Sequence, residues 1–204
     1  LDEATDFLLE AAQHREHGQP AILIRSASDA RRVTCIAVVN RDVPFLVDSI
    51  SHMLTAHGLP VDLLVHPVLP VLRNAARQLT GLPENGVETG VRESFIYIET
   101  DRIDARQRRA LEADLIETIA DVRAAVADWP LLRAAMVADA DRLTDPEGAA
   151  LLRWMGGGML TQLGHVTRQR DGSEADLLGI SRQNAEPLLA EASWKRAFAW
   201  FDDA

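Results

Sequence analysis

The sequence has 204 residues, of which 47% are hydrophobic, so the chain is long enough to bury a core and form one or two globular domains. Its 21 basic and 31 acidic residues give a formal net charge of −10, which disfavours nucleic acid, because binding to a phosphate backbone depends on clustered Lys and Arg. No apolar run reaches the roughly 20 residues of a membrane helix, and the first residues do not resemble a signal peptide. We therefore expect a cytoplasmic protein without a membrane span.

Composition also restricts the chemistry that the chain can perform. Cys35 is the only cysteine, which excludes an intrachain disulfide and a cysteine-based metal cluster, and we expect it to be buried as a small hydrophobic residue. Lys195 is the only lysine, so proton transfer or Schiff-base chemistry by lysine has almost no candidate. No Ser, His and Asp set lies in the context of a nucleophile elbow. We therefore expect no catalytic residue and no metal site in this chain.

The first elements alternate between helical and extended patterns. Helical spacing of apolar residues predicts a helix over residues 4–17, and a short strand is expected over residues 21–26. Residues 32–39 are rich in β-branched side chains and apolar on both faces, which predicts a central strand covered by helices on at least one side. Over residues 44–57 the apolar period becomes helical, and Pro44 suits the first helical turn.

The middle of the chain continues this alternation. Its prolines keep residues 61–69 extended and indicate an edge or an irregular strand end. Residues 73–91 are expected to form a long hairpin connection with a partial strand near residues 78–82. The alternating pattern of residues 94–100 predicts a strand within a sheet.

A helix capped by Asp104 and ending at Trp129 completes the pattern. Its stripe, expected to pack on a sheet, consists of Leu111, Leu115, Ile119, Val122, Val126 and Trp129. The order strand, helix, strand, strand, helix over residues 32–129 indicates an α+β fold with a ferredoxin-like split βαβ sheet and its helices on one face. The remaining strand could come from residues 21–26 or from a later segment.

Beyond Pro130, extra helices and the start of a second module are expected. The predicted segments are helices over residues 131–143 and 146–155, a hairpin from residues 160–169 and 175–180, and a helix over residues 186–201. Thr144 or Asp145 is expected to cap the second of these helices, and Trp194, Phe198, Trp200 and Phe201 are expected to be exposed on the last. The expected divisions are 1–31, an N-terminal helix and strand; 32–130, the split βαβ domain; 131–158, a helical connector; and 159–204, the start of a second α+β module.

The most informative segment, residues 38–49, places a polar turn between a buried strand and the start of a helix. Free backbone amides and the helix dipole favour a carboxylate or a phosphate at such a position. In the alternative interpretation, Asn40 or Asp42 simply caps the helix and satisfies those amides.

Four blocks of sequence resemble, in order and spacing, the N-terminal region of the large NAD-specific glutamate dehydrogenases. They are Val-Asn-x-Asp-x-Pro-Phe-Leu-Val-Asp-Ser from Val39 to Ser49, His66-Pro67-Val68, Arg92-Glu93-Ser94, and the segment from Asp121 to Trp129. The first block also resembles the start of an ACT domain, a small amino-acid-sensing module.

This resemblance implies an ACT-like regulatory domain of a homo-oligomeric enzyme that oxidises glutamate to 2-oxoglutarate and ammonia with NAD. The catalytic and NAD-binding domains of such enzymes lie downstream, so the implied partners are those domains and other subunits, and this chain is expected to hold no cofactor. ACT-like modules usually bind amino acids at the turn after the first strand. The positions that match this turn are Asn40, Arg41, Asp42, Val43 and Pro44.

Two departures from the family pattern bear on function. ACT-like modules that bind amino acids commonly have a glycine after the proline, whereas here Phe45 follows Pro44 and its bulk could block a pocket. Family members generally have an aromatic-containing segment after a Trp and before Leu-Gly, whereas here Trp154 is followed by Met155-Gly156-Gly157-Gly158-Met159, so the start of the second module departs from the family pattern. The alternative is therefore a purely structural module for contacts between domains or subunits, with no ligand.

Other candidates have simpler explanations. The glycines at positions 156–158 do not have dinucleotide-loop spacing and suggest a hinge. His14 and His17 would lie one helical turn apart but have no third metal ligand nearby in sequence. His66 is expected to hydrogen-bond to backbone through a ring nitrogen. The aspartates at positions 139, 141 and 145 are expected to form a solvated helix end.

Overall fold

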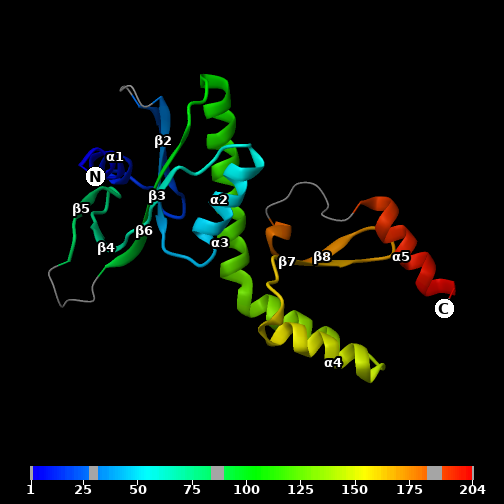
Figure 1. Ribbon diagram of the computed structural model, residues 1–204. Coiled ribbons are helices and arrows are strands. Elements are labelled where there is room, and N and C mark those ends of the chain that lie inside the picture. Colours follow the sequence, from blue (N-terminus) through cyan, green and yellow to red (C-terminus); the bar gives the residue numbers. More distant parts are fainter. Residues whose placement is uncertain (1, 28–31, 84–89, 183–189, 204) are drawn as a thin grey trace. The chain divides into compact units, whose positions relative to one another are not determined.

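The computed structural model describes residues 2–27, 32–83, 90–182 and 190–203 (Figure 1). The chain divides into two compact units, residues 1–120 and residues 121–204. Within the described parts, no helix is both long enough and apolar enough to cross a bilayer.

The first unit is built on one antiparallel sheet. Strands β2 (Val33–Arg41) and β6 (Val91–Asp101) form its centre, and β1 (Ala21–Ser26) pairs with the outer side of β2. Two segments, β3 (Leu63–Val65) and β4 (Val68–Arg73), pair one after the other with the opposite side of β6. Since β2 and β4 are both antiparallel to β6, they run parallel to each other with β6 between them.

This topology confirms the predicted split βαβ sheet and α+β fold. Helix α2 (Leu46–Ala56) makes the crossover from β2 to the β3 and β4 edge, and β1 supplies the strand that the sequence left open. The break between β3 and β4 falls at Pro67, which has no amide hydrogen to give to the ladder. Strand β5 (Leu79–Gly81) pairs with β4 and confirms the predicted partial strand, while residues 84–89 of this connection lie outside the described residues.

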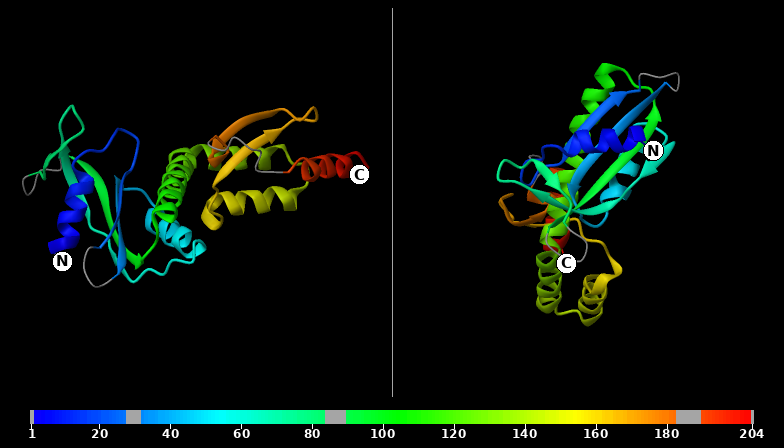
Figure 2. Two further views of the ribbon diagram at one scale, coloured as in Figure 1. Left: turned by 90° about the horizontal axis from the view of Figure 1, so that it is seen from above. Right: turned by 90° about the vertical axis from the view of Figure 1, so that its left-hand side faces the viewer.

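Both faces of the sheet are covered, because successive residues of a strand point to opposite sides. Helices α2 and α3 (Ala105–Arg142) lie on one face, and α1 (Asp2–Ala12) lies on the other (Figures 1 and 2). The first face buries Ile36, Val38, Ile96 and Ile98 against Leu46, Ile50, Leu54, Leu111, Leu115 and Ile119. The second buries Cys35, Ala37, Val39, Phe95 and Tyr97 against Phe7, Leu8, Ala11 and Ala12. The predictions for Cys35 and for the alternation of residues 94–100 are thereby confirmed.

Several predicted boundaries in this unit were wrong. Helix α1 ends at Ala12, because the next residues turn away and His14 forms an isolated bridge with Gln78. His14 and His17 are therefore exposed loop residues that do not share a helix face. Strand β2 runs two residues further than expected, to Arg41, because β6 pairs with it along its whole length.

Helix α3 also differs from the prediction, since one helix runs through Pro130 where two were expected. Proline removes one backbone donor and clashes with the preceding turn, but the buried side chains of Leu132 and Ala140 beyond it keep the helix packed in its unit. The predicted cap is confirmed: the Asp104 carboxylate accepts hydrogen bonds from the amides of Arg106 and Gln107, each at 2.8 Å.

The second unit contains the C-terminal part of α3, helix α4 (Pro146–Trp154), a hairpin and a last helix. Helix α4 is capped by Asp145, whose carboxylate accepts from the Gly148 amide at 2.7 Å. A π-helical turn, Met155–Met159, continues it and contains the glycine run that was interpreted as a hinge. The hairpin of β7 (Gly164–Arg168) and β8 (Glu174–Gly179) confirms the predicted pair of strands, and a short 3-10 turn, Ile180–Arg182, follows it.

The last helix, α5 (Glu191–Asp203), lies partly where a helix was predicted, and residues 183–189 lie outside the described residues. Trp200 and Phe201 are exposed as expected. Trp194 and Phe198 are only half-exposed, because the guanidinium groups of Arg168 and Arg170 stack over their rings, each 5.3 Å from the centroid.

Candidate functional site

The candidate site lies where β2 ends and α2 begins. The structure keeps the five predicted residues together, with Asn40 buried, Val43 half-buried, and Arg41, Asp42 and Pro44 exposed. Asn40 and Arg41 belong to the strand and not to the turn, since they pair with Ser94 and Glu93 of β6.

Asn40 is the most constrained of these residues. It is fully buried on the face of the sheet that α2 and α3 cover, two positions beyond Val38. Its amide Nδ2 donates to the Arg41 carbonyl at 2.9 Å, whereas its Oδ1 is buried without a hydrogen-bond partner. An unsatisfied buried oxygen costs about 1–3 kcal/mol, so a donor that reached it would be bound favourably.

Asp42 places a carboxylate at the same end of the sheet. Its amide donates to the Arg92 carbonyl at 3.0 Å, which extends the pairing with β6 by one residue. The Ser94 hydroxyl donates to its Oδ1 at 2.8 Å and so fixes the orientation of the side chain. The site therefore combines a buried amide oxygen with an exposed carboxylate, and both are acceptors.

The first turn of α2 provides donors next to these acceptors. The helix begins at Leu46 and not at Pro44, and its N-cap residue, Phe45, makes no side-chain capping hydrogen bond. Helices α3 and α4 are both capped by aspartate, whereas the N-cap residue of α2 has no side-chain acceptor for the first amides of the helix. Such amides attract a carboxylate.

Phe45 adopts a backbone conformation that favours glycine. Its φ of 66° and ψ of −1° lie in the left-handed region, and its side chain is 54% exposed. The turn therefore keeps the backbone shape that a glycine would give, while an exposed ring occupies the position beside it. Because the ring is largely exposed, it does not fill a buried pocket.

His66 is a second buried polar group on this side of the sheet. The pairings of Val65 with Tyr97 and of Val68 with Ser94 place it opposite Ile96. Its Nε2 is buried and has no hydrogen-bond partner, so the expected bond to backbone is not made by this nitrogen. Sequence reasoning gave no role to Ser94, although both it and His66 belong to blocks that the family resemblance had picked out.

On the opposite face, next to this site, lies a buried ionic cluster that sequence analysis did not predict, although its central residue, Glu93, belongs to one of the blocks of the family resemblance. Glu93 is fully buried, and its Oε1 accepts hydrogen bonds from Arg15 Nε at 3.0 Å and from Arg15 Nη2 at 2.7 Å. Arg73 donates from Nε to Oε1 at 2.9 Å and from Nη2 to Oε2 at 2.8 Å. Burial acts to raise the pKa of the Glu93 carboxyl, but the hydrogen bonds from Arg73 and Arg15 outweigh it and hold the pKa below 4.5.

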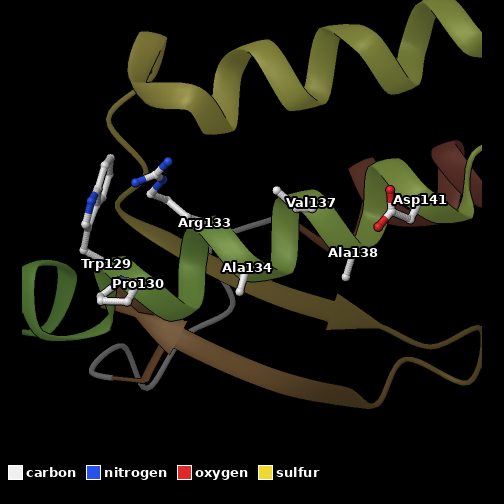
Figure 3. Close-up of a pocket in the computed structure, with 7 residues that line it drawn as sticks. All are labelled: Trp129, Pro130, Arg133, Ala134, Val137, Ala138 and Asp141. Atoms are coloured by element: carbon white, nitrogen blue, oxygen red, sulfur yellow. The ribbon is translucent and has the colours of Figure 1, made fainter.

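The second unit has a shallow groove along α3 (Figure 3). Its lining residues all come from this one helix: Trp129, Pro130, Arg133, Ala134, Val137, Ala138 and Asp141. The lining residues form two rows along the helix in which successive residues are four positions apart, and Ala134 and Ala138 stand in one of these rows. Side chains of a second helix commonly pack between such rows. Because all of its lining residues come from one helix, no second element closes the groove around a ligand.

The remaining candidates have structural roles. Among the residues that the structure describes, no group of three or more His, Cys, Asp or Glu side chains could hold a metal ion. The three aspartates near the end of α3 are used locally: Asp139 pairs with Arg142, Asp141 pairs with Arg153, and Asp145 caps α4.

Comparison with known proteins gives a consistent result. The family model described as "Glutamate dehydrogenase, ACT1 domain" matches residues 3–115. The NAD-specific glutamate dehydrogenase of Halomonas elongata is 34% identical over 146 residues, which cover 65% of this chain and 9% of that protein. The NAD-specific glutamate dehydrogenase of Pseudomonas aeruginosa is 34% identical over 126 residues, which cover 60% of this chain and 7% of that protein. The matched region is thus less than a tenth of the length of either relative.

Proposed function

This chain belongs to the glutamate dehydrogenase ACT1 domain family, and we propose that it is a regulatory and assembly module of an NAD-specific glutamate dehydrogenase that binds an amino-acid effector. In this proposal residues 32–130 form the sensing domain, and the catalytic and NAD-binding parts belong to the rest of a homo-oligomeric enzyme. The effector would occupy the segment from Asn40 to Pro44 and the first turn of α2.

The observation that carries this proposal is the unpartnered Oδ1 of the fully buried Asn40. Together with the Asp42 carboxylate, it offers two acceptors to an ammonium group. The first amides of α2 offer donors to a carboxylate at the adjacent position. An α-amino acid carries both groups on one carbon, so this arrangement favours it over a plain amine or a plain carboxylate.

Regulation requires more than binding. An effector shifts a distant active site only if it binds two states of the enzyme with different affinity. The turn is connected to the rest of the sheet through β6, because Arg92 and Ser94 of that strand hydrogen-bond to Asp42. Glu93, which lies between them in sequence, forms ion pairs with Arg15 and Arg73 on the other face. We therefore expect the effector to act by changing how α1 and the β4–β5 edge contact neighbouring parts of the enzyme.

The second candidate function is a purely structural module without a ligand. The exposed ring of Phe45, 54% accessible at the position where a glycine would leave room, favours this alternative. So does the α3 groove, which has the form of a surface for another helix. In this case the site residues would serve only to shape the turn.

A thermal-shift screen of the chain against the common amino acids distinguishes the two functions. A ligand that binds only the folded state stabilises it by about 2.7 kcal/mol at a hundredfold excess over Kd. The sensing function predicts that at least one amino acid raises Tm, while its decarboxylated amine and its deaminated acid do not. No shift with any amino acid would favour the structural module.

Variants test whether the shift arises at the proposed site. Asp42→Ala should abolish it, and Asn40→Leu, which removes the unpartnered oxygen, should weaken it. Asp62→Ala is a matched control, because Asp62 is an exposed aspartate of the same unit whose backbone amide, not its carboxylate, bonds to Glu99. An effector response that survives Asp42→Ala would place binding elsewhere.

A further inference from the structure

A second recess lies in the second unit and involves none of the residues discussed so far as the effector site. It has a volume of about 360 Å³, which is within the range of small-ligand pockets. Met136 and Asp139 of α3, Leu152 of α4, and residues 160–165 at the start of β7 line it. Its walls therefore come from three separate elements, in contrast to the groove on α3.

The polar side chains of this recess include one carboxylate, and none of the described residues that line it is Lys or Arg. Asp139 contributes the carboxylate, Gln162 an amide, Thr161 a hydroxyl and His165 an imidazole, and the last three can each donate or accept a hydrogen bond. Asp139 pairs with Arg142 at 3.2 Å, but Arg142 is 78% exposed, so this surface pair contributes little and leaves the carboxylate available.

Gln162 adds an unsatisfied acceptor. Its Nε2 donates to the Met136 sulfur at 3.2 Å, which fixes the orientation of the amide because a thioether accepts hydrogen bonds and cannot donate. The Oε1 on the other side is buried without a partner. Gln162 lines the recess, and a small rotation of its side chain would bring this buried oxygen to a hydrogen-bond donor there, which would recover the cost of leaving it unsatisfied.

The rest of the lining is apolar and partly open to solvent. Leu160 is 43% exposed and Leu163 is 54% exposed, and Leu152 and Met136 stand beside them. An occupant with an apolar body would cover these side chains, while a positively charged donor on it would reach the acceptors.

We propose that this recess binds a small organic amine in its protonated form, with an apolar body of a few carbon atoms. The ammonium group would bond to the Asp139 carboxylate and the Gln162 Oε1, and the body would contact Leu152, Leu160 and Leu163. This proposal does not depend on the effector site, which lies in the first unit.

The test is an NMR titration of the isotope-labelled chain with 3-methylbutylamine, and with 3-methylbutan-1-ol and 3-methylbutanoate as neutral and anionic molecules of similar shape. The amine should shift the signals of the Gln162 side-chain amide and of the Leu152 and Leu160 methyl groups. The alcohol should bind at least about tenfold more weakly, because hydrogen bonds to charged groups are stronger than neutral ones.

Two variants and one control complete the test. Asp139→Asn and Gln162→Leu should each weaken amine binding by about tenfold, whereas Asp141→Asn should not change it. Asp141 is a matched control, since it is an exposed aspartate of the same helix that does not line the recess. Dispersed amide spectra of all three variants would show that they fold.

The proposal would be overturned by equal binding of amine and alcohol, or by amine binding that Asp139→Asn leaves unchanged. Absence of shifts at amine concentrations on the order of 10 mM, well above a millimolar Kd, would overturn it as well. If a lysine-containing peptide bound the recess and the free amine did not, the recess would be a protein contact and not a small-molecule site.

Discussion

Arg73 of β4 and Glu93 of β6 lie on neighbouring strands and are joined by two hydrogen bonds, Nε to Oε1 at 2.9 Å and Nη2 to Oε2 at 2.8 Å. Arg73 also donates from Nη1 to the Ala12 carbonyl at 2.9 Å, so one guanidinium group connects β4, β6 and the end of α1. Glu93 also accepts from Arg15, so it ties the α1 face of the sheet to β6, the strand whose Arg92 and Ser94 bond to Asp42.

Replacing this carboxylate is expected to be costly. Glu93→Gln leaves two guanidinium groups, each 10% exposed, without a counter-charge, and loss of one partner of a buried ion pair destabilises by about 3–5 kcal/mol. Hydrogen exchange at the amides of β2 and β6, recorded at increasing urea concentrations, measures the loss of unfolding free energy in the first unit. The control is Glu10→Gln, which removes the exposed carboxylate paired with Arg25 and should change stability little. Equal effects of the two variants would contradict the prediction.

The same cluster should make stability depend on pH in the acid range. Because the pKa of Glu93 is lower in the folded state than its ordinary value of 4.5, the unfolded state binds more protons between the two values, and stability increases with pH there. This contribution is present above 4.5 and is lost as the pH falls through the folded-state pKa. The difference in stability between the wild type and Glu93→Gln should therefore shrink as the pH is lowered below 4.5. A difference that stays constant would show that the charge is not responsible.

Phe45→Gly tests the strain in the turn. A non-glycine residue in the left-handed region destabilises the folded state by about 1–2 kcal/mol, and glycine removes this cost. Glycine also gives the unfolded chain more freedom, which offsets about 0.5–1 kcal/mol of the stabilisation. We expect Phe45→Gly to stabilise the first unit by about 1 kcal/mol or less, measured as above. Phe45→Ala keeps the strained backbone without the ring and should give no gain. If Phe45→Ala stabilised as much as Phe45→Gly, the ring and not the backbone would be the source of the strain.

Gly179→Ala should disrupt the hairpin of the second unit. Gly179 has a φ of +60°, and an added Cβ would lie 2.2 Å from the Leu163 carbonyl oxygen, which is backbone and cannot move away easily. The Gly179 amide also donates to the buried Asp128 carboxylate at 2.7 Å, so a shift here would break that contact. A loss of about 2–3 kcal/mol is expected, seen as faster hydrogen exchange in β7 and β8. Gly157→Ala, where no atom lies within 4 Å of the added Cβ, should leave exchange in the hairpin unchanged.

The order of elements in the first unit could be predicted because each of its faces is a local pattern. The alternation from Ser94 to Thr100 and the helical spacing of Leu111, Leu115 and Ile119 each follow from which side of a single element is buried. The caps at Asp104 and Asp145 are likewise local, since a side chain three residues away satisfies the amides. The choice of Asn40 to Pro44 as the proposed effector site follows from the family resemblance, which matches these positions to the turn after the first strand.

What the sequence by itself determined is thus the order of helical and extended segments in the first unit, the buried faces of its main elements and the family. The end of β2, the continuous α3 through Pro130 and the left-handed Phe45 were decided by the tertiary structure, because pairing with β6 and packing beyond the proline outweigh local preference. The Arg15–Glu93–Arg73 cluster depends on it entirely. Arg15 lies 78 residues and Arg73 lies 20 residues from Glu93 in sequence, and only the folded chain brings the three charges together. Because they are buried away from water, each charge is stable there only when the opposite charge is beside it.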